Sequence, residues 1–261
     1  MTNLGEPKST NQMGIKMRNI AALFVILSSL TTPVFSQELK NNTWKCAWCV
    51  GVSITKIFGG NGGFSFNFPL DTTGCPDPNY TPFANRTASS TCNAVHYVTT
   101  LRSAAITGST ISMMFSITGS NPVFDACVEG QLIVDGVNQC YPNPGSPPNC
   151  RFYIEHANDT YITNPGYRWW SQTYIANGVE TAAWPLQLAS NVLFTVDLND
   201  LTKWSDVNGL RADQDPDGLF NDTKAHPYAV GFTCSGIFSY GHGVRLTAGS
   251  AKFVLQSYSI N

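Results

Sequence analysis

Charged residues are scarce in this sequence. They make up 12% of its 261 residues, about half the usual fraction, and the formal net charge is −2. The chain therefore lacks the basic surface that binding to nucleic acid or to an anionic membrane requires. Long runs of Ala, Leu, Glu and Lys are also absent, whereas Gly, Pro, Ser, Thr and Asn are abundant. This balance is typical of a β-protein with many turns.

Several catalytic and metal-binding motifs are missing as well. The four histidines form no HxH or HExxH pattern, and no G-x-S-x-G elbow precedes a helix, which disfavours a catalytic metal and an esterase. A glycosidase would need two carboxylates about 5–10 Å apart. Five acidic residues are candidates for such a pair, and their spacing selects none of them: Asp125, Glu129, Glu155, Glu180 and Asp197. A glycan-active enzyme is therefore kept as an alternative, and no catalytic residue is assigned.

Residues 1–36 have the pattern of a secretory signal with a short N-terminal extension. Lys16 and Arg18 precede the apolar residues 20–27, and residues 34–36 supply a small-residue cleavage pattern. The apolar run is too short to be a good membrane span, and Pro33 follows soon after it. We expect a mature chain without a membrane span that is secreted, to the extracellular space or the periplasm.

All eight cysteines follow this segment, and an even number in an exported chain indicates disulfide bonds. Pairing by proximity gives Cys46–Cys49, Cys75–Cys92 and Cys127–Cys140, which leaves Cys150 for Cys234. The CxxC of the first pair has neither a second CxxC for zinc nor a thioredoxin-like context, so we expect a structural bridge. A glycoprotein is indicated by five sequons, at Asn41, Asn79, Asn85, Asn158 and Asn221.

The chain after Gly63 alternates between apolar and polar residues in short segments separated by turn residues. Phe64, Phe66 and Phe68 share one face of a predicted strand, and the same alternation recurs at residues 111–117 and 192–198. One helical turn is expected near residues 198–204. The pattern predicts an all-β fold, a disulfide-stabilised jelly-roll-type β-sandwich of two antiparallel sheets over residues 64–261. Residues 37–63 are interpreted as an irregular leader rich in Cys and Gly.

Aromatic residues concentrate in residues 165–198, which hold three of the six tryptophans. Successive side chains of a strand point to opposite faces, so Trp169 and Trp170 cannot both enter the same core. If one indole is buried, the other faces outward beside Tyr167 and Arg168. An outward indole with a polar rim suits the face of a sugar ring, whereas the alternative is that both indoles are structural. The predicted ligand-binding residues are Tyr167, Arg168, Trp169, Trp170 and Trp184.

The second half of the chain resembles a secreted jelly-roll module, similar to galactose-binding-like carbohydrate-binding modules. The resemblance covers residues 100–260 and rests on Tyr167-Arg168-Trp169-Trp170-Ser171, on residues 194–198 and 204–209, on Val230-Gly231-Phe232 and on a final strand over 251–260. The Cys-rich segment 120–150 and the insert 211–226 depart from the pattern. The resemblance implies two packed sheets, a structural calcium and a sugar site on a sheet face or in the end loops.

An acidic motif lies in the insert at residues 213–218, with the D-x-D-x-D-G opening of an EF-hand loop. Its carboxylates would converge at the turn made by Gly218, and hard oxygens suit calcium. The closing Glu of an EF-hand is absent, because Lys224 holds the twelfth position. The predicted calcium ligands are Asp213, Asp215, Asp217 and Asn221, and a solvated acidic turn is the alternative.

The sequence thus favours a non-catalytic, carbohydrate-binding protein that uses outward aromatics on a β-sandwich. Its partner would be a polysaccharide or glycan, and its cofactor a structural calcium. A structural or adhesive surface protein that self-associates through edge strands, as a homo-oligomer, has the same composition and is the first alternative.

Overall fold

Two antiparallel β-sheets build the protein in the computed structural model. The structure describes residues 44–47, 49, 51–57, 63–70, 94–95, 97–126, 133–134, 137–138, 148–158, 165–171, 173–174, 180–206, 209–235 and 243–261. The predicted signal, residues 1–36, lies outside this part of the chain. Within it, no helix combines the length and the apolar character needed to cross a membrane.

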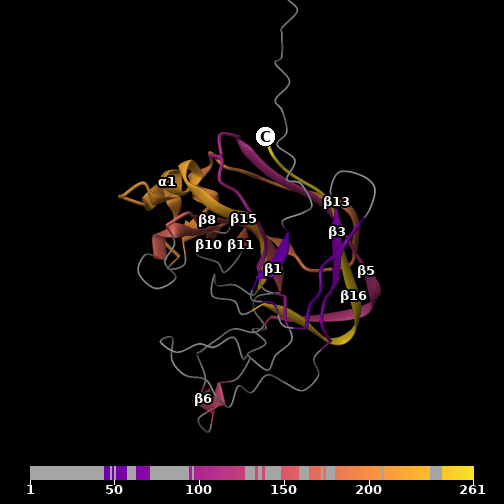
Figure 1. Cartoon of the computed structure of the whole chain (residues 1–261). Coiled ribbons are helices and arrows are strands. Elements are labelled where there is room, and N and C mark those ends of the chain that lie inside the picture. Colours follow the sequence, from indigo (N-terminus) through magenta and orange to yellow (C-terminus); the bar gives the residue numbers. More distant parts are fainter. Residues whose placement is uncertain are drawn as a thin grey trace, which may run out of the picture. The chain divides into compact units, whose positions relative to one another are not determined.

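Sheet I has the strand order β1-β4-β15-β8-β9-β14, with β12 paired to β8. Its strands are β1 (Lys45–Ala47), β4 (Tyr97–Leu101), β8 (Asn149–His156), β9 (Arg168–Trp170), β12 (Trp184–Pro185), β14 (Ser205–Asp206) and β15 (Pro227–Ser235). Sheet II has the order β13-β5-β16-β3-β2. Its strands are β2 (Thr55–Lys56), β3 (Phe64–Asn67), β5 (Thr110–Ala126), β13 (Ala189–Asp197) and β16 (Val244–Ile260). The long strands β5 and β16 run beside one another in Figure 1.

The remaining elements are short. Two small two-stranded ladders pair β6 (Ile133–Val134) with β7 (Val137–Asn138), and β10 (Thr173–Tyr174) with β11 (Glu180–Thr181). The turns of 3-10 helix are η3 (Pro165–Tyr167), η4 (Leu201–Lys203) and η5 (Ala212–Gln214), and η4 confirms the helical turn expected near residues 198–204. One α-helix, α1 (Leu219–Ala225), precedes β15 in the described part of the chain.

The connectivity is that of a jelly roll. Taken in chain order, the strands β3, β4, β5, β8, β9, β13, β15 and β16 can be numbered from first to eighth. Sheet II then has the order sixth-third-eighth-first, and sheet I has second-seventh-fourth-fifth. Chain neighbours therefore alternate between the two sheets, except for β8 and β9, which pair with each other in sheet I. This is the double Greek key of jelly-roll proteins. The predicted all-β sandwich of two antiparallel sheets is confirmed.

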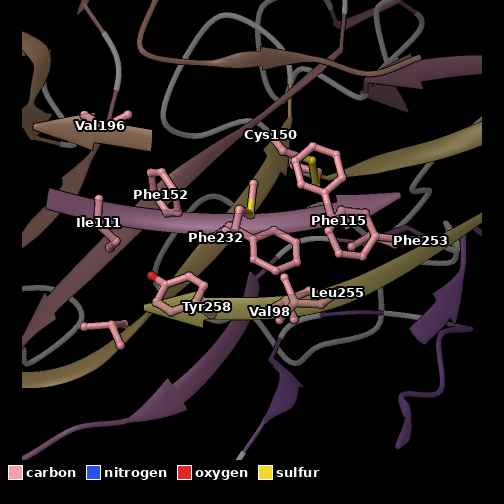
Figure 2. Close-up of a cluster of buried hydrophobic side chains, with 14 of the residues drawn as sticks. Val98, Ile111, Phe115, Cys150, Phe152, Val196, Phe232, Phe253, Leu255 and Tyr258 are labelled. Atoms are coloured by element: carbon pink, nitrogen blue, oxygen red, sulfur yellow. A yellow bond between two sulfur atoms is a disulfide. The ribbon is translucent and has the colours of Figure 1, made fainter. Parts of the chain in front are cut away.

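The core lies between the two sheets and is dominated by phenylalanine. Phe64 of sheet II stacks on Phe232 of sheet I with ring centroids 6.4 Å apart, and Phe152 of sheet I stacks on Phe194 of sheet II at 4.8 Å. Figure 2 shows how side chains from both sheets fill this layer. The predicted inward positions are buried as expected, including Ile111, Met113, Phe115 and Ile117 in β5. The alternation of apolar and polar residues therefore predicted these strands correctly, because it shows which face of a strand is buried in the core.

The described residues of the segment interpreted as an irregular leader belong to the sandwich. β1 pairs with β4, with Cys46 opposite Val98, and β2 pairs with β3, with Thr55 opposite Ser65. The side chain of Trp44 is buried and packs on Phe64 with ring centroids 5.1 Å apart. The domain boundary predicted at Gly63 is thus wrong. These strands have only two or three residues, too short for a visible alternation.

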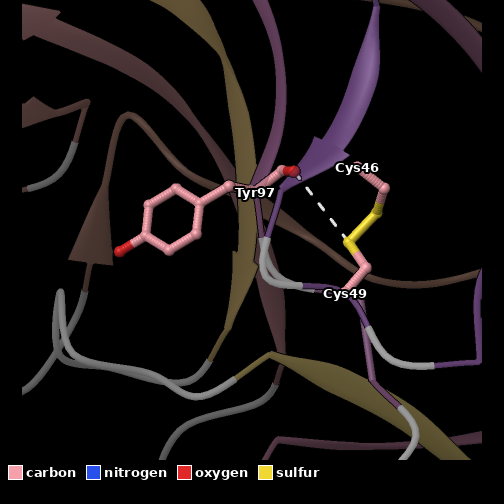
Figure 3. Close-up of a disulfide and its surroundings, with 3 residues drawn as sticks. All are labelled: Cys46, Cys49 and Tyr97. Carbon is pink, nitrogen blue, oxygen red and sulfur yellow. Dashed lines mark hydrogen bonds between the residues drawn. A yellow bond between two sulfur atoms is a disulfide. The ribbon is translucent and has the colours of Figure 1, made fainter. Parts of the chain in front are cut away.

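Two of the predicted disulfides are present. Cys46 bonds to Cys49, with the Cys49 Sγ 3.9 Å from the carbonyl oxygen of Tyr97 (Figure 3), and Cys150 bonds to Cys234. The second bridge joins residues directly opposite each other on β8 and β15, and both sulfurs belong to the core. The pairs proposed for Cys75, Cys92, Cys127 and Cys140 lie outside the described residues.

Tyr258 makes the stability of the folded protein depend on pH in the alkaline range. Its ring is buried, and its hydroxyl donates to the carbonyl oxygen of Gly231 at 3.0 Å. Burial raises the pKa of Tyr258 well above its ordinary value of 10.0, and the nearby charge of Arg102 offsets part of this rise. The folded state therefore holds this proton more tightly than the unfolded state.

We expect the stabilisation from Tyr258 to be complete below about pH 10 and to fall above it, by up to about 1.4 kcal/mol per pH unit. Tyr258→Phe should lower the free energy of unfolding by about 1 kcal/mol at pH 7, because a buried hydrogen bond is lost. The variant should lose less stability than the natural chain between pH 9 and about 11. Chemical denaturation followed by circular dichroism measures both effects, and identical alkaline slopes would contradict the assignment.

Candidate functional site

Sheet I turns one face to the core and the other away from it. Along β8, Cys150, Phe152 and Ile154 belong to the core, so the alternating residues between them point to the opposite side. We call this side the outer face of sheet I. Cross-strand register places the following residues on it: Tyr97, Thr99, Asn149, Arg151, Tyr153, Glu155, Arg168, Trp170, Gly231 and Thr233.

The two neighbouring tryptophans diverge, as the sequence predicts. Trp169 pairs with Ile154 and enters the core, where it packs edge-on against Phe220 with ring centroids 5.1 Å apart. Trp170 pairs with Tyr153 on the outer face and lies 5.2 Å from its ring. Both indoles, however, are only 1% exposed. The predicted exposed indole platform is therefore wrong, because the outer face is itself buried at Trp170.

The other predicted ligand-binding residues lie in different places. Arg168 is half-buried on the outer face, directly opposite Glu155. Tyr167 is half-buried in η3 and stacks on His156, with ring centroids 4.1 Å apart. Trp184 packs edge-on against Phe115 of the core, which makes a structural role the better interpretation. Of the five residues, Arg168 and Trp170 share the outer face.

The outer face combines aromatic rings with charged groups. Tyr97 and Tyr153 meet edge-on with ring centroids 5.0 Å apart, and the Tyr153 hydroxyl donates to Glu155 at 3.0 Å. Arg151 is fully buried and donates from Nε to the side-chain oxygen of Asn149 at 2.8 Å. Removing a guanidinium and a carboxylate from water costs folding free energy unless both are paired. Their presence on one sheet face therefore indicates a role in structure or in ligand binding.

One polar atom on the outer face is left unsatisfied. The side-chain oxygen of Thr233 is buried and has no hydrogen-bond partner. Thr233 lies opposite both Tyr97 and Arg151 in the neighbouring strands. A buried hydroxyl without a partner costs about 1–3 kcal/mol, so its position marks a place for a water molecule or a ligand group.

The outer face reaches solvent at part of its area. Tyr97, Glu155 and Arg168 are half-buried, and Leu101 at the end of β4 is exposed. These residues could contact a ligand, whereas Arg151, Tyr153 and Trp170 lie beneath the surface and hold them in place. The sequence alone did not single out Glu155, Tyr97 or Thr233. Their common face follows from strand register, which joins segments more than fifty residues apart.

The predicted calcium loop is organised in another way. Asp213 accepts two hydrogen bonds from Arg211, at 2.8 and 2.7 Å. Asp215 accepts from the backbone N–H groups of Asp217 and Phe220, so it caps the start of α1. Asn221 is exposed on α1. The carboxylates of Asp213 and Asp215 are thus engaged separately, and calcium binding at this loop stays a prediction of the sequence.

A different cluster of ligand-type residues was missed by sequence analysis. His156, Asp222 and His226 place three ligand atoms within 4.8 Å of one another, the one such group among the described residues. Asp222 lies on α1 and His226, four residues later, is the C-cap of this helix, but the helix itself was not predicted. His156 comes from β8, and no spacing in the sequence connects it to the other two.

Comparison with protein-family models and with curated proteins finds no match to this chain. The resemblance to galactose-binding-like modules therefore stays an expectation from the sequence. The jelly-roll architecture stands on the strand order alone, and fold does not determine function.

Proposed function

We propose that this protein is an exported, non-catalytic module that binds carbohydrate on the outer face of sheet I. The observation that carries the proposal is the cross-strand pair of Glu155 and Arg168, half-buried beside the rings of Tyr153 and Trp170. A carboxylate accepts hydrogen bonds and a guanidinium donates them, so the pair can form hydrogen bonds with neighbouring hydroxyls of one sugar.

The aromatic residues supply the apolar part of such a site. Tyr97 is half-buried on the same face, and its ring packs edge-on against the ring of Tyr153. Stacking a sugar ring on a phenol removes apolar area from water at roughly 25 cal/mol per Å². After the costs of association, a few contacts of this kind give weak to moderate affinity. A polymeric ligand that offers several sugars would suit a site of such weak to moderate affinity best.

Export is the second part of the proposal. The signal-like residues 1–36 and the disulfides Cys46–Cys49 and Cys150–Cys234 both suit an oxidising compartment. The described part of the outer face provides one carboxylate, Glu155, whereas hydrolysis of a glycoside normally needs two. Binding without catalysis is thus favoured over a glycan-active enzyme.

A glycan array with the purified chain from Gln37 onward tests the proposal. We expect Glu155→Gln and Arg168→Met to weaken binding of the best glycan at least about tenfold, since each removes a charged hydrogen bond. Thr195→Val on the opposite sheet is the matched control, because Thr195 is exposed and its hydroxyl bonds only to Ser112 among the contacts that the structure shows. No glycan bound above background, or equal binding by all variants, would remove the proposal.

Self-association is the second candidate, and the edge of sheet II favours it. β13 is the last strand on its side of the sheet, and it exposes 63% of Leu193 beside the exposed Met114 of β5. This strand contains neither lysine nor proline, which natural sheets use to block edges, so it can pair with a second copy. Sedimentation velocity on the same preparations separates the two candidates, because an assembling protein that binds no glycan would support this one.

A further inference from the structure

The cluster of His156, Asp222 and His226 lies outside the proposed carbohydrate surface, and its chemistry is different. The Nε2 atom of His156 lies 3.2 Å from one carboxylate oxygen of Asp222, and the Nδ1 atom of His226 lies 2.9 Å from the other. Asp222 thus stands between two imidazoles. We infer that these three side chains form a binding site for a divalent transition-metal ion such as Zn²⁺ or Co²⁺.

The three ligand residues are held by regular structure. His156 is the last residue of β8 and lies directly opposite Pro227 of β15, the residue after His226. The backbone N–H of Ala157 donates to the carbonyl oxygen of His226 at 2.8 Å, which ties the two histidine segments together. Asp222 lies on α1, and His226 is the C-cap of the helix, with its backbone N–H donating to the carbonyl oxygen of Asp222. A site on a strand end and a helix is more precisely positioned than a site on loops.

The ring of His156 is fixed and poorly satisfied. It is only 2% exposed, and the ring of Tyr167 stacks on one side of it. Its buried Nε2 makes no hydrogen bond, although a carboxylate oxygen of Asp222 lies 3.2 Å away. A buried ring nitrogen without a hydrogen-bond partner, within 4.8 Å of two other ligand atoms, can be satisfied by a bound cation.

The donor set selects the class of ion. Two imidazole nitrogens and one carboxylate oxygen suit zinc and the other first-row divalent metals, whereas calcium takes oxygen ligands. The side chains of Asp222 and His226 are 42% and 66% exposed. Water can therefore fill the remaining coordination positions, as in zinc and non-haem iron sites with three protein ligands.

One hydrogen bond opposes metal binding and limits its strength. The backbone N–H of Asn158 donates to the Nδ1 atom of His156 at 2.8 Å, so the neutral ring carries its proton on Nε2. Ligation through Nε2 moves this proton to Nδ1, and the Asn158 contact must then open. Because Asn158 lies in an exposed turn, its peptide can rotate without disturbing the core. We therefore expect an affinity below that of a closed structural zinc site.

The test uses the chain from Gln37 onward after dialysis against a chelator. Titration with CoCl₂, followed by the visible absorption of Co²⁺, and calorimetry with ZnCl₂ should both show one ion bound per chain. His226→Ala and Asp222→Asn should each weaken binding at least about tenfold, the effect expected for loss of a ligand. Asp200→Asn should leave both titrations unchanged, because Asp200 caps η4, is not part of the cluster, and Asn can keep the cap.

The outcomes are distinct. Absence of a Co²⁺ spectrum and of a zinc heat in the natural chain would overturn the inference, as would equal weakening by Asp200→Asn and His226→Ala. Thermal denaturation with and without chelator gives a second measurement, because an ion that binds only the folded chain raises its melting temperature. His226 is exposed, so His226→Ala should fold like the natural chain and keep the comparison valid. Glycan binding is measured on separate residues, so failure of either proposal leaves the other standing.

Discussion

Replacing Cys150 and Cys234 together by alanine is expected to lower the free energy of unfolding by about 4–5 kcal/mol. The bridge closes a long loop, because its ends are 84 positions apart in sequence, and chain-entropy reasoning assigns such a loop about this stabilisation. Both sulfurs also pack in the core between the sheets, so their loss leaves unfilled space there. Guanidinium denaturation without reductant measures the change.

The other described bridge supplies the matched control. Cys46 and Cys49 are separated by only three residues, so the same reasoning gives about 1–2 kcal/mol for their double alanine variant. The larger loss expected at Cys150–Cys234 combines the longer loop with the deeper burial of its sulfurs. Equal destabilisation by the two double variants would contradict both the loop-length and the packing contribution.

The second large effect is expected at the paired tryptophans. Trp169→Ala and Trp170→Ala should each lower the free energy of unfolding by about 3–5 kcal/mol, the usual cost of removing a buried aromatic side chain. Trp169 supports α1 through Phe220, and its Nε1 donates to the carbonyl oxygen of Gly166 at 2.8 Å. Trp170 supports Tyr153 on the outer face of sheet I.

Equilibrium denaturation followed by far-ultraviolet circular dichroism measures both tryptophan variants, with Leu193→Ala as control. Leu193 is exposed, so its variant should change stability by no more than about 0.5 kcal/mol. A loss below about 1 kcal/mol at either tryptophan would show that the ring is not held in the packed layer. Loss of glycan binding in a tryptophan variant would not identify a contact residue, because unfolding gives the same result.

Sequence patterns predicted the strands correctly where only one face of the strand is buried. Phe64, Phe66 and Phe68 alternate with polar residues because one side of β3 faces the core. The same logic predicted that Trp169 and Trp170 diverge. It could not predict that Trp170 is also buried, because alternation distinguishes the two faces of a strand but does not tell whether the second face meets water.

Sites that combine residues from distant segments could not be predicted from the sequence, for a different reason. The helix α1 has seven residues, too few for a clear helical period, and its start is capped by Asp215 from within the motif interpreted as a calcium loop. Without that helix, the relation of Asp222 to His226 is not visible. The contact of either residue with His156 depends on the pairing of β8 with β15, which no local pattern encodes.

The position of β16 in sheet II has a consequence for the order of assembly. This strand lies between β5 and β3, yet it follows every other strand of both sheets in the chain. During synthesis, β5 and β3 therefore have no permanent neighbour between them until residues 244–260 have left the ribosome. Completion of sheet II is therefore expected to be a late and slow step of folding, because it depends on contacts between distant segments, and the phenylalanine-rich strands stay exposed to aggregation until it occurs.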